Sequence, residues 1–175
     1  MNVRMLARHL AGYLTGLSIF AGAAPYGLYK LSTFHPIPLP AGPTFRLAVA
    51  LILGIVGGLF ALWSNAALLI RGEGGPTDAF NVAISPRTKH LVVSGPYRYS
   101  RNPMVFGAFS VYFALAVYWN SAQTLAALAL LLAAAKFYLK ATEEKRLLKD
   151  FGTEYLEYRE NTPMILPRFA GKSRK

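Results

Sequence analysis

The chain has 175 residues, of which 54% are hydrophobic, and its 19 Lys and Arg against 8 Asp and Glu give a formal net charge of +11. Its apolar residues form blocks and its basic residues gather on alternate connections, so membrane topology explains the charge better than nucleic-acid binding does. The absence of Cys excludes disulfides and thiolate chemistry, and three widely separated His predict no metal site.

The first apolar block runs from Leu10 to Leu31 and follows the basic residues Arg4 and Arg8. Its 22 residues are enough to cross a hydrocarbon layer about 30 Å thick. A cleaved secretory signal is the alternative, because small residues follow the basic start. Since Pro25 lies just beyond the candidate cut and more apolar blocks follow, an uncleaved spanning helix is favoured.

Four prolines between His35 and Pro43 predict an extended loop before the second apolar block. This block, Leu47 to Ile70, has 24 residues and no charge, which predicts a second span. Its Gly54 and Gly58 form one G-x-x-x-G pattern, with Gly57 between them, and these glycines are interpreted as ordinary tolerated residues of an apolar helix.

The third apolar stretch predicts a helical hairpin with arms at 104–119 and 122–139. Asn120 and Ser121 mark its turn, and the arms of 16 and 18 residues are near the lower limit for a full crossing. The whole chain is therefore expected to be one all-α membrane domain over 1–175, with four transmembrane helices.

The distribution of Lys and Arg predicts the orientation of these helices. The segment from Arg71 to Arg101 carries 5 of them and the chain from Lys136 onward carries 10, whereas the first loop carries 2. Basic connections stay in the cytoplasm, so both termini and the 71–103 loop are expected inside.

After the hairpin, Leu148, Phe151, Tyr155 and Tyr158 recur at helical spacing among charged residues, which predicts a C-terminal amphipathic helix. Gly152 within it costs about 1 kcal/mol relative to Ala, so a kink or break is expected there. The catalytic region is expected to combine about 71–103 with about 140–167.

Two groups of charged residues are candidates for chemistry. Arg98 and Arg101 lie in the constrained loop LVVSGPYRYSRNPM, and Glu143 and Glu144 are the first acids after the hairpin. Each group alone is more simply explained, as a lipid-phosphate contact or as a solvated helix face. Because the hairpin returns both groups to one membrane face, a shared binding site for a zwitterionic ligand is predicted.

The loop GPYRYSRNP, the hairpin, and the following EEKRLLKDFGTEYLEYRENTPMILP together resemble the isoprenylcysteine carboxyl methyltransferase and phospholipid methyltransferase family. Three blocks agree in order and spacing, from Lys89 to Pro167: G-x-Y-x-x-x-R-x-P, the Glu pair, and F-G-x-x-Y-x-x-Y. The first two helices resemble the family only as generic spans.

The resemblance implies S-adenosylmethionine as cofactor, held by the loop and the ends of the hairpin. Arg98, Arg101 and Glu144 are the catalytic candidates. The residues expected to bind or adjoin the cofactor are Lys89, His90, Leu91, Val92, Tyr97, Asn102, Pro103, Met104, Val105 and Glu143. The chain departs from the family at Asn102, where His is typical, and at Val105, where Tyr is typical.

The resemblance also implies a lipidic or membrane-partitioned methyl acceptor. Asn102 cannot titrate, which favours an acceptor that ionises readily, and carboxyl methylation of an isoprenylcysteine-like substrate is the first expectation. Ethanolamine phospholipids and small thiols are the alternative acceptors. A sterol-type membrane reductase is a second enzyme class, and a scaffold or small transporter is a non-catalytic alternative, for which intramembrane charge or broken-helix symmetry would be expected.

Overall fold

The computed structural model describes residues 3–72, 78–79, 82–83 and 90–169. These residues are helical apart from connecting loops and one ladder of two-residue strands, so the predicted all-α class is confirmed for this part of the chain. The elements are α1 (Val3–Leu17), a π-helical turn (Ser18–Ala23), α2 (Ala24–Thr33), α3 (Pro43–Arg71), β1 (Asp78–Ala79), β2 (Val82–Ala83), a 3₁₀ turn (Gly95–Arg98), α4 (Pro103–Tyr118), α5 (Ala122–Ala141) and α6 (Glu143–Asn161).

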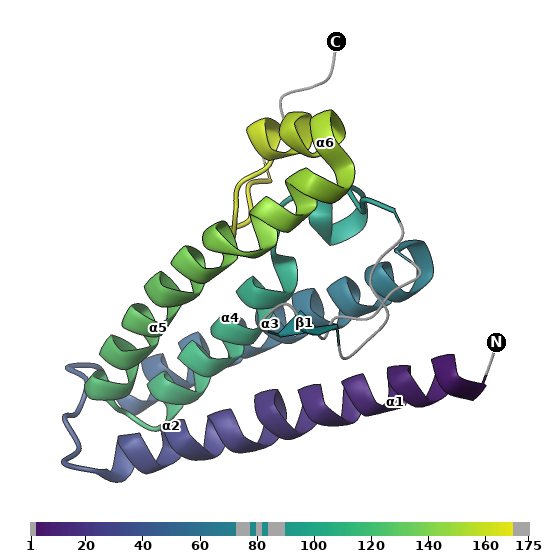
Figure 1. The fold of residues 1–175 in the computed structure, drawn as a ribbon. Helices are drawn as coiled ribbons and strands as arrows, with labels where there is room; N and C mark the ends of the chain where they lie inside the picture. The colour runs from purple at the N-terminus through teal and green to yellow at the C-terminus, as the bar shows by residue number, and fades with distance from the viewer. Residues whose placement is uncertain (1–2, 73–77, 80–81, 84–89, 170–175) are drawn as a thin grey trace.

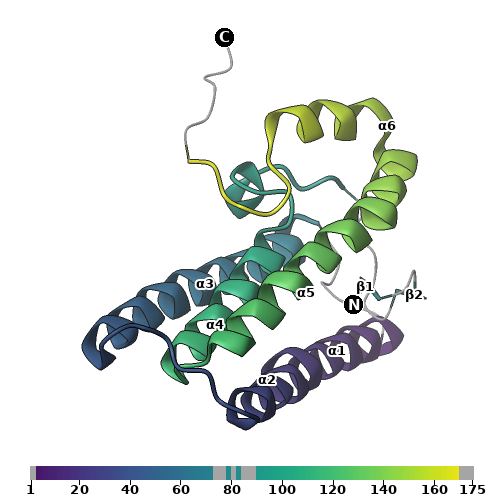
Figure 2. The same ribbon diagram turned by 90° about the vertical axis from the view of Figure 1, so that its left-hand side faces the viewer.

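Helices α1 to α5 lie roughly lengthwise in the molecule (Figure 1). α1 and α2 form a single long rod, α3 lies beside α4, and α5 returns antiparallel to α4 as the second arm of the hairpin (Figures 1 and 2). α6 turns away from the end of α5 and lies above the connection that leads into α4.

The proline loop and the hairpin turn meet at one end of the molecule. The backbone N–H of Leu39 donates to Asn120 Oδ1 at 2.8 Å, and the N–H of Ile37 donates to Gln123 Oε1 at 3.0 Å. Asn120 has φ of +58°, in the left-handed region that Asn tolerates in tight turns. These bonds join two connections that are far apart in sequence and leave the charged segments at the other end.

The first helix is interrupted at a place that the sequence explains. Pro25 has no N–H, and Ala24 donates to Ile19 in the π-helical pattern, so the carbonyl of Phe20 lacks its backbone donor. The Tyr112 hydroxyl of α4 donates to that carbonyl at 2.8 Å instead. The helix predicted over 10–31 is thus a π-interrupted rod that extends from Val3 to Thr33.

α3 and α4 come into close contact at two glycines. A Cβ built on Gly57 would lie 2.7 Å from the carbonyl oxygen of Gly107, and one on Gly107 would lie 2.6 Å from the backbone nitrogen of Ala61. The interpretation of the α3 glycines as merely tolerated is therefore wrong for Gly57, because only a residue without a side chain fits there. It holds for Gly58, where a built Cβ would meet no atom of the described residues within 4 Å.

Among the residues that the structure describes, two helical segments are long and apolar enough to cross a membrane: α3 and Ala122–Asn161, which joins α5 to α6. Only 22% of the apolar window in α3 and 17% of that in Ala122–Asn161 is buried by the protein itself, unlike the core helix of a soluble domain. α4, with 16 residues, is a shorter apolar helix. The protein thus has the character of a membrane protein, and the four-span arrangement stays a prediction.

α6 is bent at Gly152, where a break was predicted. Gly152 has φ of +54° and ψ of −126°, a conformation that is open mainly to glycine. The bend separates the first turns of α6, which carry Glu143 and Glu144, from the second half, which carries Tyr155 and Tyr158.

Candidate active site

The connection between α3 and α4 and the segment after α6 pair along their backbones. We name residues 91–102 the motif loop and residues 162–169 the tail. The N–H of Arg101 donates to Pro163 O at 2.8 Å, the N–H of Asn102 to Met164 O at 3.0 Å, and the N–H of Arg168 to Tyr99 O at 3.0 Å. The tail therefore holds the motif loop in one conformation at the start of α4.

Arg101 connects the motif loop, both halves of α6 and the tail. Its guanidinium forms an ion pair with Glu144, and both side chains are only 11% exposed. Nη1 also donates to the Tyr155 hydroxyl at 3.2 Å, and Nε donates to the carbonyl of Thr162 at 3.0 Å. Because the partners come from three segments, this one side chain fixes their relative positions.

Two buried tyrosines complete the contact between α6 and the motif loop. The Tyr158 hydroxyl donates to the carbonyl of Tyr97 at 2.7 Å. Burial raises the pKa of Tyr158 and that of Tyr97, and the negative charge of Glu143 raises the pKa of Tyr97 further. Both phenols therefore stay protonated at neutral pH and can act as hydrogen-bond donors.

Glu143 differs from its neighbour Glu144 in its surroundings. Its side chain is 35% exposed, and its ion pair with Arg146 is long, at 3.9 Å. The surrounding protein raises the pKa of Glu143, because burial disfavours the carboxylate, and the charge of Glu144 adds to this effect. Glu143 is thus a reachable carboxylate beside Tyr97, and among the residues that the structure describes its ion pair is this long one, which is the pattern expected of a binding group.

The start of the motif loop is attached to the end of α3. Val92 and Tyr97 are buried against Ala67, with Leu68 beside them. Arg71 Nη1 donates to Ser94 Oγ at 2.7 Å. The 3₁₀ turn then begins at Gly95, whose φ of +65° requires glycine.

The structure distributes the predicted site residues unevenly. Tyr97, Arg101, Glu143 and Glu144 come together around α6. Asn102 follows Arg101 in the motif loop, and its amide Nδ2 donates to Met164 O of the tail at 3.1 Å. The other cofactor candidates lie at the two ends of the motif loop and in the first turn of α4: buried Val92 and Pro103, half-buried Leu91, Met104 and Val105, and exposed His90.

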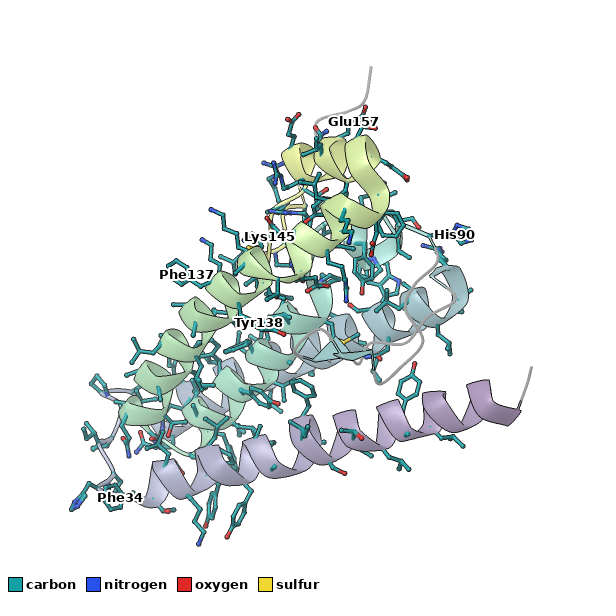
Figure 3. All side chains as sticks on the ribbon, viewed as in Figure 1. Phe34, His90, Phe137, Tyr138, Lys145 and Glu157 are labelled. Atoms are coloured by element: carbon teal, nitrogen blue, oxygen red, sulfur yellow. The ribbon has the colours of Figure 1, made fainter. Side chains whose placement is uncertain are left out.

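Two candidates are exposed to solvent. Arg98 is exposed, in contrast with the nearly buried Arg101. His90 is exposed as well and lies at the edge of the molecule at the same end as Lys145 and Glu157, opposite Phe34 (Figure 3). Lys89 lies outside the described residues.

Sequence reasoning did not assign Tyr155, Tyr158 or the carbonyl of Thr162 to the site. The two tyrosines were visible in the F-G-x-x-Y-x-x-Y pattern, where their spacing of three was attributed to an amphipathic face. Their hydroxyls form hydrogen bonds with Arg101 and with the motif loop. The pair of tyrosines on one amphipathic face was therefore the sequence signal that could have assigned them to the site. The backbone carbonyls of the tail gave no signal in sequence.

The chain matches the family model described as Phospholipid methyltransferase over residues 45–154. It is also 29% identical over 147 residues to Methanethiol S-methyltransferase 2 of Bradyrhizobium diazoefficiens, covering 81% of this chain and 55% of that protein. The chain thus spans about half the length of this curated relative. No solved structure matches the chain significantly.

The family match covers more than half of the chain, and the protein therefore belongs to the phospholipid methyltransferase family. This confirms the resemblance noted on the motif loop, the Glu pair and the Tyr pattern. The match starts near the beginning of α3, so it extends beyond the segment from Lys89 on which that resemblance was based.

Proposed function

We propose that this protein is an S-adenosylmethionine-dependent methyltransferase that works at the cytoplasmic face of a membrane. The observation that carries the proposal is Glu143, a reachable carboxylate of raised pKa beside a rigid frame formed by the motif loop, α6 and the tail. Membership of the phospholipid methyltransferase family supports the reaction class.

The residues present fit the proposed cofactor. S-adenosylmethionine carries an ammonium group, ribose hydroxyls and a positively charged sulfonium, and when bound it supplies an electrophilic methyl group. Glu143 is suited to accept from the ammonium or the hydroxyls, since within the described residues its ion pair with Arg146 is long, at 3.9 Å. Asn102, Met104 and the residues from His90 to Val92 would complete the pocket.

Arg101 and Glu144 have a different role in this proposal from Glu143. Each satisfies the other's charge, and the pair is almost excluded from solvent, so neither is free to bind an acceptor. We assign them as positioning residues that hold the motif loop against α6. Arg98, which is exposed in the same loop, is then the arginine that can orient an anionic acceptor.

The membrane arrangement is part of the same proposal. Four spans would be formed by the α1–α2 rod, α3, α4 and α5, with both termini and the motif loop in the cytoplasm, following the excess of Lys and Arg on that side. The proline loop and the hairpin turn would then lie outside, which agrees with their hydrogen bonds to each other.

A small thiol is the acceptor class that we favour. A thiol ionises more readily than an alkylammonium group, with reference pKa values of about 8.5 and 10.4. A thiol acceptor therefore needs less help from a catalytic base, which suits a site in which Asn102 replaces the typical His. The name of the curated relative, Methanethiol S-methyltransferase 2, supports the same class. The residues named above would hold the cofactor, which would supply the methyl group for transfer to the thiolate, and the thiol proton would leave to solvent.

A second acceptor is an isoprenylcysteine-like carboxylate, which needs no base and which exposed Arg98 can orient. An ethanolamine headgroup is less suited, because an amine must lose a proton and the buried phenol of Tyr97 is a poor base. The site must in every case hold acceptor and methyl group in line and exclude water.

The acceptor can be identified with methyl-labelled cofactor and the detergent-solubilised full chain. Methanethiol, a farnesylated cysteine peptide and phosphatidylethanolamine would be offered separately, with a Glu143→Ala variant as the inactive control. We expect label in dimethyl sulfide. Label mainly in the peptide ester would show that the second acceptor, and not the thiol, is the substrate. A folded protein that transfers label to none of them and binds no adenosyl cofactor would favour a scaffold.

A further inference from the structure

A pocket lies at the end of the molecule opposite the candidate active site. It has a volume of about 340 Å³ and is lined by Pro43, Arg46, Leu47 and Tyr118, from the first turn of α3 and the last residue of α4. Arg46 and Arg71 are 25 residues apart on one helix, so roughly 38 Å along its axis separate this pocket from the motif loop.

Arg46 carries donors that the protein leaves without an acceptor. Nε and Nη1 of its guanidinium are shielded from solvent, and within the part of the chain that the structure describes neither nitrogen has a hydrogen-bond partner. Buried donors are almost always paired in folded proteins, and leaving a charged one unpaired is costly. A ligand that supplies acceptor oxygens would remove this cost.

An apolar groove continues from the pocket between α3 and α4. It has a volume of about 240 Å³ and shares Leu47 and Tyr118 with the pocket. Its lining residues are entirely non-ionisable at neutral pH: Leu47, Ala50, Leu51, Gly54, Val111, Ala114, Leu115 and Tyr118.

The groove has a defined length. From Leu47 to Gly54 it follows two turns of α3, roughly 10 Å. The next turn brings Gly57 into contact with Gly107, where the two backbones leave no room for a side chain. The groove therefore leads from the guanidinium into the apolar layer and stops at the glycine contact.

We infer that the pocket and the groove together bind one anionic phospholipid, with its phosphate on Arg46 and one acyl chain in the groove. A guanidinium is a preferred partner of phosphate, and a helix end at a membrane surface is where headgroups lie. The apolar lining of the groove requires an apolar partner, and a free phosphate has no apolar part. In the proposed topology, this lipid belongs to the leaflet opposite the active site.

The test uses the purified full chain in detergent and native mass spectrometry, with phosphatidylglycerol, phosphatidylcholine and inorganic phosphate as separate probes. Arg46→Gln removes the charge, and Arg46→Lys keeps the charge but removes the guanidinium donors. Gly54→Leu fills the groove while leaving Arg46 intact. Lys30→Gln is the matched control, because exposed Lys30 carries the same charge at the same end of the molecule.

We expect wild type and Lys30→Gln to retain one phosphatidylglycerol equally. Retention should fall at least fivefold in Arg46→Gln and in Gly54→Leu and less in Arg46→Lys, with thermal unfolding checking the fold of each. Equal retention in Arg46→Gln and Lys30→Gln would overturn the inference. The inference would also be overturned if inorganic phosphate or phosphatidylcholine bound as tightly as phosphatidylglycerol. A lipid-free dimer that Gly54→Leu dissociates would overturn it too.

Discussion

Arg101 of the motif loop and Glu144 of α6 form a nearly buried ion pair across 43 positions of sequence. The pair also involves Tyr155, and the arginine reaches the tail through Thr162. The motif loop precedes α4 and α6 follows α5, so both lie at the open end of the α4–α5 hairpin. The ion pair is thus the contact that converts two separate sequence motifs into one site.

Replacing Arg101 with Ala should destabilise the protein by about 3 to 5 kcal/mol, because Glu144 would be left buried without its cation. Chemical denaturation in detergent, followed by Trp fluorescence, measures this loss. Arg159→Ala is the control, since Arg159 is exposed in the last turn of α6, and its effect should stay within about 0.5 kcal/mol. Similar small losses for both variants would show that the ion pair does not hold the site.

Removing both charges should cost less than removing one. In the double variant Arg101→Met, Glu144→Leu, no uncompensated charge remains in the nearly buried site. We therefore expect its unfolding free energy to exceed that of Arg101→Ala. A double variant as unstable as the sum of the two single changes would mean that the two side chains act independently.

Tyr158→Phe should weaken the attachment of α6 to the motif loop. The change removes the hydroxyl that donates to the Tyr97 carbonyl at 2.7 Å and leaves that buried acceptor unpaired, at a cost of about 1 to 3 kcal/mol. Thermal unfolding compares it with Tyr26→Phe, in which the hydroxyl lost is that of a residue 64% exposed. An equal melting temperature for the two variants would contradict the account.

The contact between α3 and α4 can be tested with adjacent glycines. Gly57→Ala places a methyl group 2.7 Å from a backbone oxygen, so α3 and α4 must separate, which typically costs about 1 to 3 kcal/mol. Gly58→Ala meets nothing within 4 Å and should be neutral or stabilising, because Ala favours helix. Thermal unfolding of the two variants should differ, and an identical effect would rule out the close contact.

The hydropathy blocks located the helices, but two features needed three-dimensional information. Gly57 and Gly58 have the same chemistry in sequence, and only the position of α4 shows that Gly57 is the contact residue. The π-helical turn could be anticipated from Pro25, yet its stabilisation by Tyr112 depends on a residue 92 positions from Phe20. Packing between distant segments is not encoded in any local pattern.

The candidate site was only partly predictable, because it too depends on packing between distant segments. The motif loop and the Glu pair were visible as charged groups flanking the hairpin, and hairpin geometry placed them at one face. Their division of roles was not visible, because adjacent Glu143 and Glu144 differ only in what surrounds them. The structure gives Glu144 a close arginine and leaves Glu143 with a distant one.

The raised pKa of Glu143 predicts an unusual dependence of stability on pH. A carboxyl whose pKa is raised on folding stabilises the protein fully below its unfolded pKa of about 4.3, and this contribution is lost as pH rises through the folded pKa. Glu143→Gln should therefore raise the melting temperature at neutral pH and have no effect near pH 4. Glu144→Gln should lower it at neutral pH, because Arg101 loses its partner. A stabilising effect of Glu144→Gln there would contradict the assigned roles.

The account depends most directly on cofactor binding at Glu143, which calorimetry of the purified full chain with S-adenosylhomocysteine measures. We expect Glu143→Gln to weaken binding at least tenfold, about 1.4 kcal/mol, while remaining folded, and exposed Glu157→Gln to bind as wild type does. Wild-type affinity should also fall as pH is lowered through the raised pKa of Glu143, since the protonated carboxyl no longer attracts the ammonium. Equal affinity in wild type and Glu143→Gln would contradict the proposed site.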